Sequence, residues 1–131
     1  MVDVGLDAMS QDIANALEDE LMVIGLDYQV RFANSALRRR LRKEAGSFIG
    51  GLCYEVSQGR DKPCSAPLWD CPLGRVLESG SLMMVLHRVH TLGTDSYLKI
   101  TTYPLRDSRG NINAILELRR NVTAERQLET Q

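Results

Sequence analysis

The sequence predicts an α+β domain in which one antiparallel sheet carries helices on one side. Two short runs of β-compatible residues lie before residue 34, and three more lie after residue 81. A stretch rich in helix and turn signals separates the two groups of strands. Both ends of the chain show helical periodicity, so we expect a helix to flank the sheet domain on each side.

Composition excludes several classes of protein. A chain of 131 residues, 44% apolar and 25% charged, is typical of one globular domain whose core needs no disulfide or metal. A net charge of −1 argues against direct binding of nucleic acid. No apolar run approaches the ~20 residues of a membrane span, and the N-terminus lacks the pattern of a secretory signal. We therefore expect a cytoplasmic domain without membrane contact.

Residues 5–20 are predicted to form a helix, because apolar residues recur there every three or four positions. These residues are Leu6, Met9, Ile13 and Leu17. The stripe fits a helix that lies on its own domain and equally fits a seam with a second chain. In the second interpretation Met9, Ile13 and Leu17 are the dimerisation residues of a homodimer. Residues 1–20 are assigned to an N-terminal flanking helix.

Residues 21–33 are predicted to form a β-hairpin, and Asn34 is a candidate N-cap for the helix that follows. Leu37 and Leu41 supply the buried edge of that helix. Its basic residues, at positions 38–43, have no aromatic residues between them, so we interpret them as a solvated face.

Glycine and proline punctuate residues 44–71, which favours loops and short helical turns. A clearer helix is predicted at residues 72–79. Pro72 suits its first position, and Gly80 suits the position after its C-cap.

The last third of the chain predicts strands at residues 82–91, 97–105 and 112–118, separated by turn signals. In the last strand the apolar residues at even positions alternate with polar residues, so we expect them to form its buried face. A final helix is predicted to begin near Thr123, with Asn121 or Thr123 as its cap.

Segments of this chain, in this order, resemble the PAS family of sensory domains. They are residues 16–24, 30–34, 103–111 and 119–125, the last of which is similar to the family's Asp-Ile-Thr signature. The resemblance covers about residues 14–128. It implies a five-stranded antiparallel sheet of order 2-1-5-4-3, with helices on one face that enclose a pocket. Residues 21–122 would then be the PAS domain, and residues 123–131 the start of a C-terminal signalling helix.

The resemblance implies a sensory input domain of a bacterial signal-transduction protein, such as a two-component sensor histidine kinase. It would sense redox state, a metal or a small ligand, and relay the state through a dimeric helical linker to a downstream effector. The alternative is a ligand-free PAS module for dimerisation in a transcription regulator or cyclic-dinucleotide enzyme. Asn121 and Thr123 stand at the signature's relay positions. Asn121 can cap a helix but cannot form the ion pair that the family's aspartate forms.

Cys53, Cys64 and Cys71 fall, on the PAS layout, in the helical block that covers the pocket. Together with His87 or His90 they would supply four ligands to zinc or an iron–sulfur cluster. His87 and His90 are three residues apart, so on a regular strand only one of them faces the pocket. Cysteines that only pack, a metal or cluster site, and a reversible disulfide all remain open interpretations.

The cofactor is unknown from the sequence, but two cofactors of PAS domains are disfavoured. The cysteine motif of light-sensing flavin domains, Asn-Cys-Arg-Phe-Leu-Gln, does not occur, and the helix at residues 72–79 has no histidine to bind haem iron. A small-ligand pocket would be lined by Trp69, Met83, Val85, Leu98, Ile100 and Leu116.

Catalysis by this chain is not expected. The sequence holds no phosphate-binding loop, no Gly-x-Ser-x-Gly and no His-Glu-x-x-His. A nucleophilic cysteine needs a neighbouring base, and His87 and His90 are the only histidines.

Overall fold

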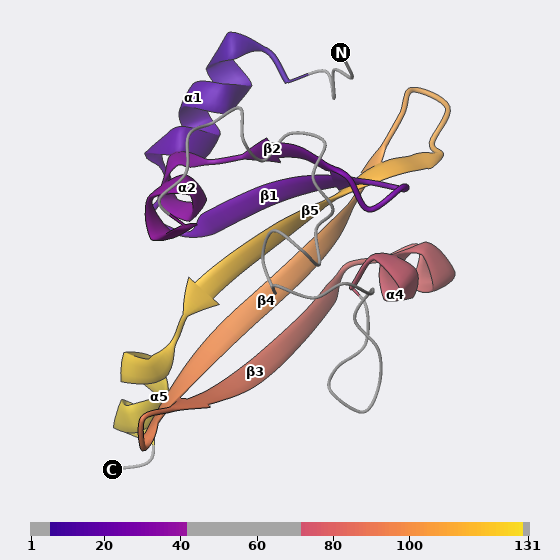
Figure 1. Cartoon of the computed structure of the whole chain (residues 1–131). Helices are drawn as coiled ribbons and strands as arrows, with labels where there is room; N and C mark the ends of the chain where they lie inside the picture. Colours follow the sequence, from indigo (N-terminus) through magenta and orange to yellow (C-terminus); the bar gives the residue numbers. More distant parts are fainter. Residues whose placement is uncertain (1–5, 42–71, 130–131) are drawn as a thin grey trace.

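A computed structural model of the chain describes residues 6–41 and 72–129. Its elements are α1 (Ala8–Ala16), β1 (Glu20–Gly25), β2 (Val30–Ala33), α2 (Ser35–Leu41), α4 (Pro72–Ser79), β3 (Met83–Thr91), β4 (Thr94–Arg106), β5 (Ile112–Asn121) and α5 (Thr123–Glu129). The strands form one antiparallel sheet in the order β2-β1-β5-β4-β3 (Figure 1). The predicted fold class and strand order are confirmed.

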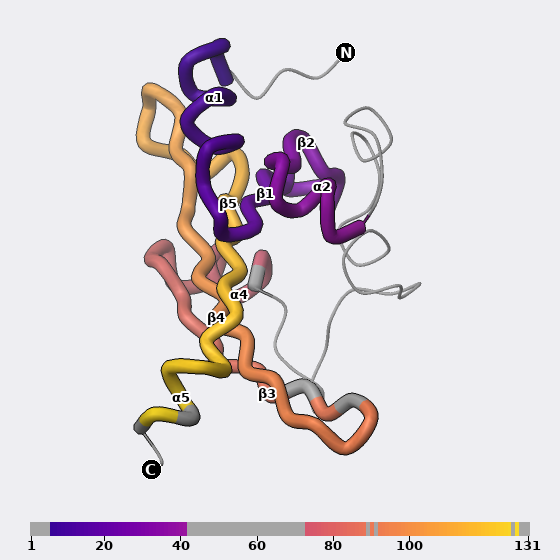
Figure 2. The backbone as a smooth tube through the Cα atoms, turned by 90° about the vertical axis from the view of Figure 1, so that its left-hand side faces the viewer, coloured from indigo at the N-terminus to yellow at the C-terminus, as the bar shows by residue number. Residues whose placement is uncertain are grey.

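Helix α1 is shorter than the predicted helix at residues 5–20. The Asp7 side chain caps its start by accepting a hydrogen bond of 2.7 Å from the Ser10 N–H. Leu17 has extended backbone angles and ends the helix, and β1 begins three residues later at Glu20. Figures 1 and 2 place α1 and α5 at opposite ends of the sheet.

Strand β4 begins three residues earlier than predicted, because the turn before it is tight. Leu92 and Gly93 both have positive φ, at 53° and 79°, and the flanking residues Thr91 and Thr94 pair with each other. Two positive φ values in a two-residue turn are typical of the hairpin turn whose twist matches the strands.

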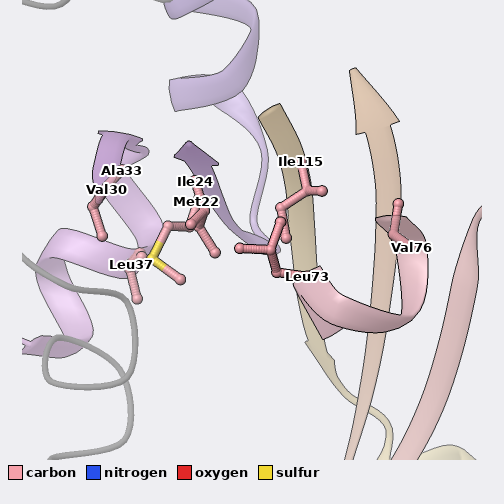
Figure 3. Packing of buried hydrophobic residues seen from close by; sticks show 8 residues of the cluster. All are labelled: Met22, Ile24, Val30, Ala33, Leu37, Leu73, Val76 and Ile115. Carbon is pink, nitrogen blue, oxygen red and sulfur yellow. The ribbon is translucent and has the colours of Figure 1, made fainter. Parts of the chain in front are cut away.

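One face of the sheet packs on α2 and α4, and we call it the inner face (Figure 3). Side chains alternate along a strand, so Met22 and Ile24 of β1 share this face with Ile115 of β5. Leu37 of α2 and Val76 of α4 pack against them. These five side chains are at most 1% exposed, which makes this the best-packed part of the described core.

The opposite, outer face packs on α1. Ala14 of α1 contacts the cluster formed by Leu21, Val23 and Phe32, and Leu6 covers part of it. The predicted apolar stripe is therefore divided. Leu6 lies against its own domain, whereas Met9, Ile13 and Leu17 face away from it, with exposures of 71%, 60% and 41%.

A buried asparagine joins the N-terminal elements. Asn34 is 0% exposed, and its Oδ1 accepts hydrogen bonds from the N–H groups of Leu21 and Leu37 at 3.0 and 3.1 Å. Its Nδ2 donates to the carbonyl oxygens of Ala14 and Asp19, both at 2.9 Å. All four side-chain bonding positions are filled, so one residue fixes the end of α1, the start of β1 and the cap of α2.

Candidate ligand-binding site

The inner face continues from the apolar core across β5, β4 and β3. Residues directly opposite one another on paired strands share a face, and two rows cross the sheet here. The first row is Met22, Glu117, Thr102 and Met83, and the second is Glu20, Arg119, Ile100 and Val85. Each row thus carries ionisable side chains on β1 or β5 and apolar side chains on β3 or β4.

Two charged residues of β5 are buried on this face. Glu117 is 7% exposed and Arg119 is 9% exposed, and Thr102 beside Glu117 is 1% exposed. Glutamate and arginine are seldom so deeply buried unless they are paired. Their burial therefore requires an explanation from their hydrogen bonding.

The hydrogen bonding of this cluster is incomplete. Arg119 Nη1 and Glu20 Oε1 are buried, and neither has a hydrogen-bond partner within the described part of the chain. The other carboxylate oxygen of Glu20, Oε2, accepts a bond of 2.6 Å from Arg40 Nε at the surface. Glu20 and Arg119 are cross-strand neighbours, so a buried donor and a buried acceptor lie side by side without a partner.

The charges of this cluster act on each other. Burial raises the pKa of the Glu117 carboxyl above its ordinary value of 4.5, and the Glu20 carboxylate adds to the rise while Arg119 opposes it. Burial also lowers the pKa of His87 below 6.5, with a further contribution from the Arg119 guanidinium. Both shifts favour the neutral form of the group concerned.

A hollow of about 660 Å³ lies on the outer face beside Leu6 and Val23. Its charged side chains already have partners. Arg31 Nη2 bonds Asp27 Oδ2 at 2.7 Å, and Arg106 donates to the carbonyl oxygens of Gly110 and Gly80. These bonds hold the surrounding turns together, so the hollow differs from the inner face, where polar atoms lack partners.

Comparison with family models matches residues 14–127 of this chain to the family described as the PAS fold. The chain belongs to the PAS fold family. This match, with the confirmed strand order, bears out the family resemblance noted in the sequence. A comparison with curated proteins finds no match.

Solved structures of PAS domains are similar to this chain. The PAS domain of BvgS from Bordetella pertussis is 12% identical, with a TM-score of 0.62, and the alignment covers 93% of this chain and 89% of that one. The PAS domain of nitrogen regulation protein NR(II) from Vibrio parahaemolyticus is 17% identical, with a TM-score of 0.63 and coverages of 88% and 99%. VqmA, in the Vibrio cholera VqmA-Ligand-DNA complex, is 19% identical, with a TM-score of 0.62 and coverages of 90% and 52%. At these identities the likeness shows the fold alone.

Four of the six predicted pocket residues share the inner face of this PAS domain: Met83, Val85, Leu98 and Ile100. Leu116 lies on the opposite, outer face. It packs in the outer cluster with Val23 and Ala114, because neighbours along a strand point to opposite faces. Trp69 lies outside the described residues.

The sequence analysis missed Glu20, Glu117 and Arg119, because it took the apolar side of the last strand as its buried side. Both sides of β5 are covered, and Ile115 with the two charged residues forms the inner one. The available signal was a pair of opposite charges at positions 117 and 119, which alternate in step with the apolar Ile115.

His87 is half-buried on the inner face, in register with Leu98. His90 is exposed on the other face, where its Nδ1 lies 2.6 Å from Asp95 Oδ1. The prediction that only one histidine faces inward is confirmed. Cys53, Cys64 and Cys71 lie outside the described residues, and residues 6–41 and 72–129 contain no metal-ligating cluster of their own. A zinc or iron–sulfur site therefore stays a prediction.

The two predicted relay residues join α5 to the sheet. Asn121 Oδ1 accepts a bond of 3.0 Å from the Thr123 N–H, and Thr123 Oγ1 accepts one of 2.9 Å from the Tyr97 N–H. The Val122 N–H donates to the Tyr97 carbonyl at 2.8 Å, and the Arg126 guanidinium lies 5.2 Å from the centre of the Tyr97 ring. The start of α5 is thus attached to β4 next to Leu98, which faces the inner site. No helix among the described residues is long and apolar enough to cross a membrane.

Proposed function

We propose that this PAS domain is a sensory input module that binds a small ligand against the inner face of its sheet. The observation that carries the proposal is the pair of buried atoms without partners, Arg119 Nη1 and Glu20 Oε1. A buried polar atom that lacks a hydrogen bond costs about 1–3 kcal/mol. A ligand that bonds both atoms would recover this free energy and bind preferentially to the folded domain.

The arrangement supports binding rather than catalysis. The inner face places the hydrogen-bonding groups of Glu20 and Arg119 beside apolar side chains of β4 and β3. Such a combination of apolar walls and a few polar groups suits the binding of a small molecule.

In this proposal the ligand's presence is relayed through β4 to α5. Leu98 faces the site, and the adjacent Tyr97 holds the start of α5. A shift of β4 on binding would change the population of two packings of α5, which a linked effector could read. The effector that we propose is a sensor histidine kinase, with the domain as a homodimer through the exposed side of α1. The ligand and DNA named with VqmA support a regulatory setting.

A thermal-shift screen of small metabolites against the purified chain tests the proposal, with hits located by two-dimensional NMR. We expect some compounds to raise Tm and to shift the amide signals of Thr102, Glu117 and Arg119. Arg119→Met should abolish that stabilisation, whereas Lys99→Met, an exposed cation one strand away, should keep it. Stabilisers that act only elsewhere, or no stabiliser at all, would favour the ligand-free dimerisation module.

A further inference from the structure

We infer that the inner face recognises a small neutral molecule that carries an amide-type edge, with a hydrogen-bond acceptor beside a donor, on an apolar body. This inference rests on the proposed ligand-binding function and names the chemical class of the ligand. It follows from the unpaired atoms, the opposed charges of Glu20 and Arg119, and the apolar composition of the wall.

The two unpaired atoms require opposite partners. A guanidinium N–H can only donate, so Arg119 Nη1 needs an acceptor. An ionised carboxylate can only accept, so Glu20 Oε1 needs a donor. Because Glu20 and Arg119 are directly opposite on paired strands, their Cβ atoms are about 5 Å apart. One planar group with a C=O next to an N–H can satisfy both.

The charge of the cluster argues against a charged ligand. The Glu20 carboxylate already bonds the Arg40 guanidinium at the surface and lies across the strands from Arg119, so the ionised groups here oppose one another. Bringing another net charge into a buried site is costly unless it finds a fresh counter-ion. The raised pKa of Glu117 shows that this environment already disfavours one charge. A neutral amide avoids that cost while it makes both hydrogen bonds.

The rest of the wall is apolar. Val85 and Ile100 continue the row of Glu20 and Arg119 across the sheet, and Met83 lies one row away. Ile100 is 6% exposed and Met83 packs against the inner core. A ligand whose polar edge lies at β1 and β5 would therefore rest its body on β4 and β3. Small-molecule sites commonly combine such apolar walls with a few oriented polar groups.

Three compounds of one shape test the inference: benzamide, benzoate and benzamidine. Benzamide offers an acceptor and a donor, benzoate two acceptors and one negative charge, and benzamidine two donors and one positive charge. Titrations followed by NMR on the purified chain should give benzamide a Kd near or below about 1 mM. We expect benzoate and benzamidine to bind about tenfold more weakly or not at all.

Two matched variants make the test specific. Glu20→Met removes the acceptor, so the affinity for benzamide should fall about fivefold. The affinity for benzoate should rise relative to that for benzamide. Arg40→Met breaks the same exposed ion pair but leaves Glu20 Oε1 in place, so the preference for benzamide should persist. A change of preference is a readout that mere loss of stability would not produce.

Each other outcome overturns the inference in a recognisable way. Tightest binding by benzoate or benzamidine, with shifts at Thr102 and Arg119, would refute the neutral class but keep the inner-face ligand site. Binding of none of the three, together with a metabolite hit of another class at the same residues, would also refute the class alone. If no compound shifts these residues, and an ordered water fills the gap in a crystal structure, both the class and the proposed function fail.

Discussion

Asn34 and the Glu20–Arg119 pair are both buried polar positions beside β1, yet they differ in one respect. Every donor and acceptor of the Asn34 side chain is bonded to the backbone of a neighbouring element. Arg119 Nη1 and Glu20 Oε1 are equally buried and have no partner in the described residues. A satisfied polar group specifies a fold, whereas a buried unsatisfied one costs stability and needs another reason to be there. Asn34 therefore serves the fold, whereas the Glu20–Arg119 pair is the candidate for a binding role.

The largest expected effect is at Asn34. Asn34→Ala would remove four hydrogen bonds at the junction of α1, β1 and α2, although the Ala14 carbonyl keeps its bond from the Leu17 N–H, and should cost about 3–4 kcal/mol. Urea unfolding measures the loss. Asn113→Ala, at an exposed position of β5, is the matched control and should change the unfolding free energy by less than about 0.5 kcal/mol. A loss below about 1 kcal/mol at Asn34 would remove the structural side of the comparison.

Glu117→Gln should stabilise the unliganded domain by about 1 kcal/mol at pH 8, because it removes a buried carboxylate. The folded pKa of Glu117 lies above its ordinary 4.5, so the folded state holds this proton more tightly than the unfolded state. Its favourable contribution is present below pH 4.5 and is lost as pH rises through the folded pKa. The advantage of the variant should therefore be near zero at pH 4 and grow towards pH 8.

His87 affects stability at the other end of the pH range, because its folded pKa lies below 6.5. Its burial lowers the free energy of unfolding as pH falls below 6.5. Both proteins carry His87, so the difference between them isolates Glu117. Urea unfolding at several pH values gives that difference. An equal loss of stability at pH 4 and pH 8 would instead mean that the carboxyl is well paired.

The attachment of α5 should respond to a smaller change. Thr123→Val keeps the shape of the side chain but removes the acceptor for the Tyr97 N–H, and should cost about 1 kcal/mol. We expect faster hydrogen exchange at the Tyr97 amide and in α5, with unchanged exchange rates in the core. Thr123→Ser keeps the hydroxyl and should behave as the wild type. Unchanged exchange in Thr123→Val would show that this bond does not hold α5.

The smallest effect on stability is expected on the exposed side of α1. Changing Met9, Ile13 and Leu17 together to glutamine should alter the unfolding free energy of the monomer by less than about 1 kcal/mol, because these side chains face away from the domain. The same change should abolish dimerisation, measured by sedimentation at several concentrations. A triple variant that still dimerises would place the interface elsewhere.

The sequence predicted the elements well, because strand and helix periodicities differ and turn residues mark their ends. It overextended α1, since Leu17 continues the apolar stripe while its backbone is already extended. It also assigned Leu116 to the pocket and overlooked Glu117 and Arg119. Alternation along β5 is clear from the sequence, but which side faces α4 depends on pairing with β1 and β4, and no local pattern contains that information.

The most direct test of the account is the double variant Glu117→Leu with Arg119→Met, which replaces the charged part of the inner face by apolar side chains of similar size. We expect its unliganded unfolding free energy to equal or exceed that of the wild type, and its affinity for benzamide to fall by at least about tenfold. A loss of about 3 kcal/mol, comparable to that of Asn34→Ala, would show that the charges stabilise the fold and would contradict the assignment of the inner face as a ligand site.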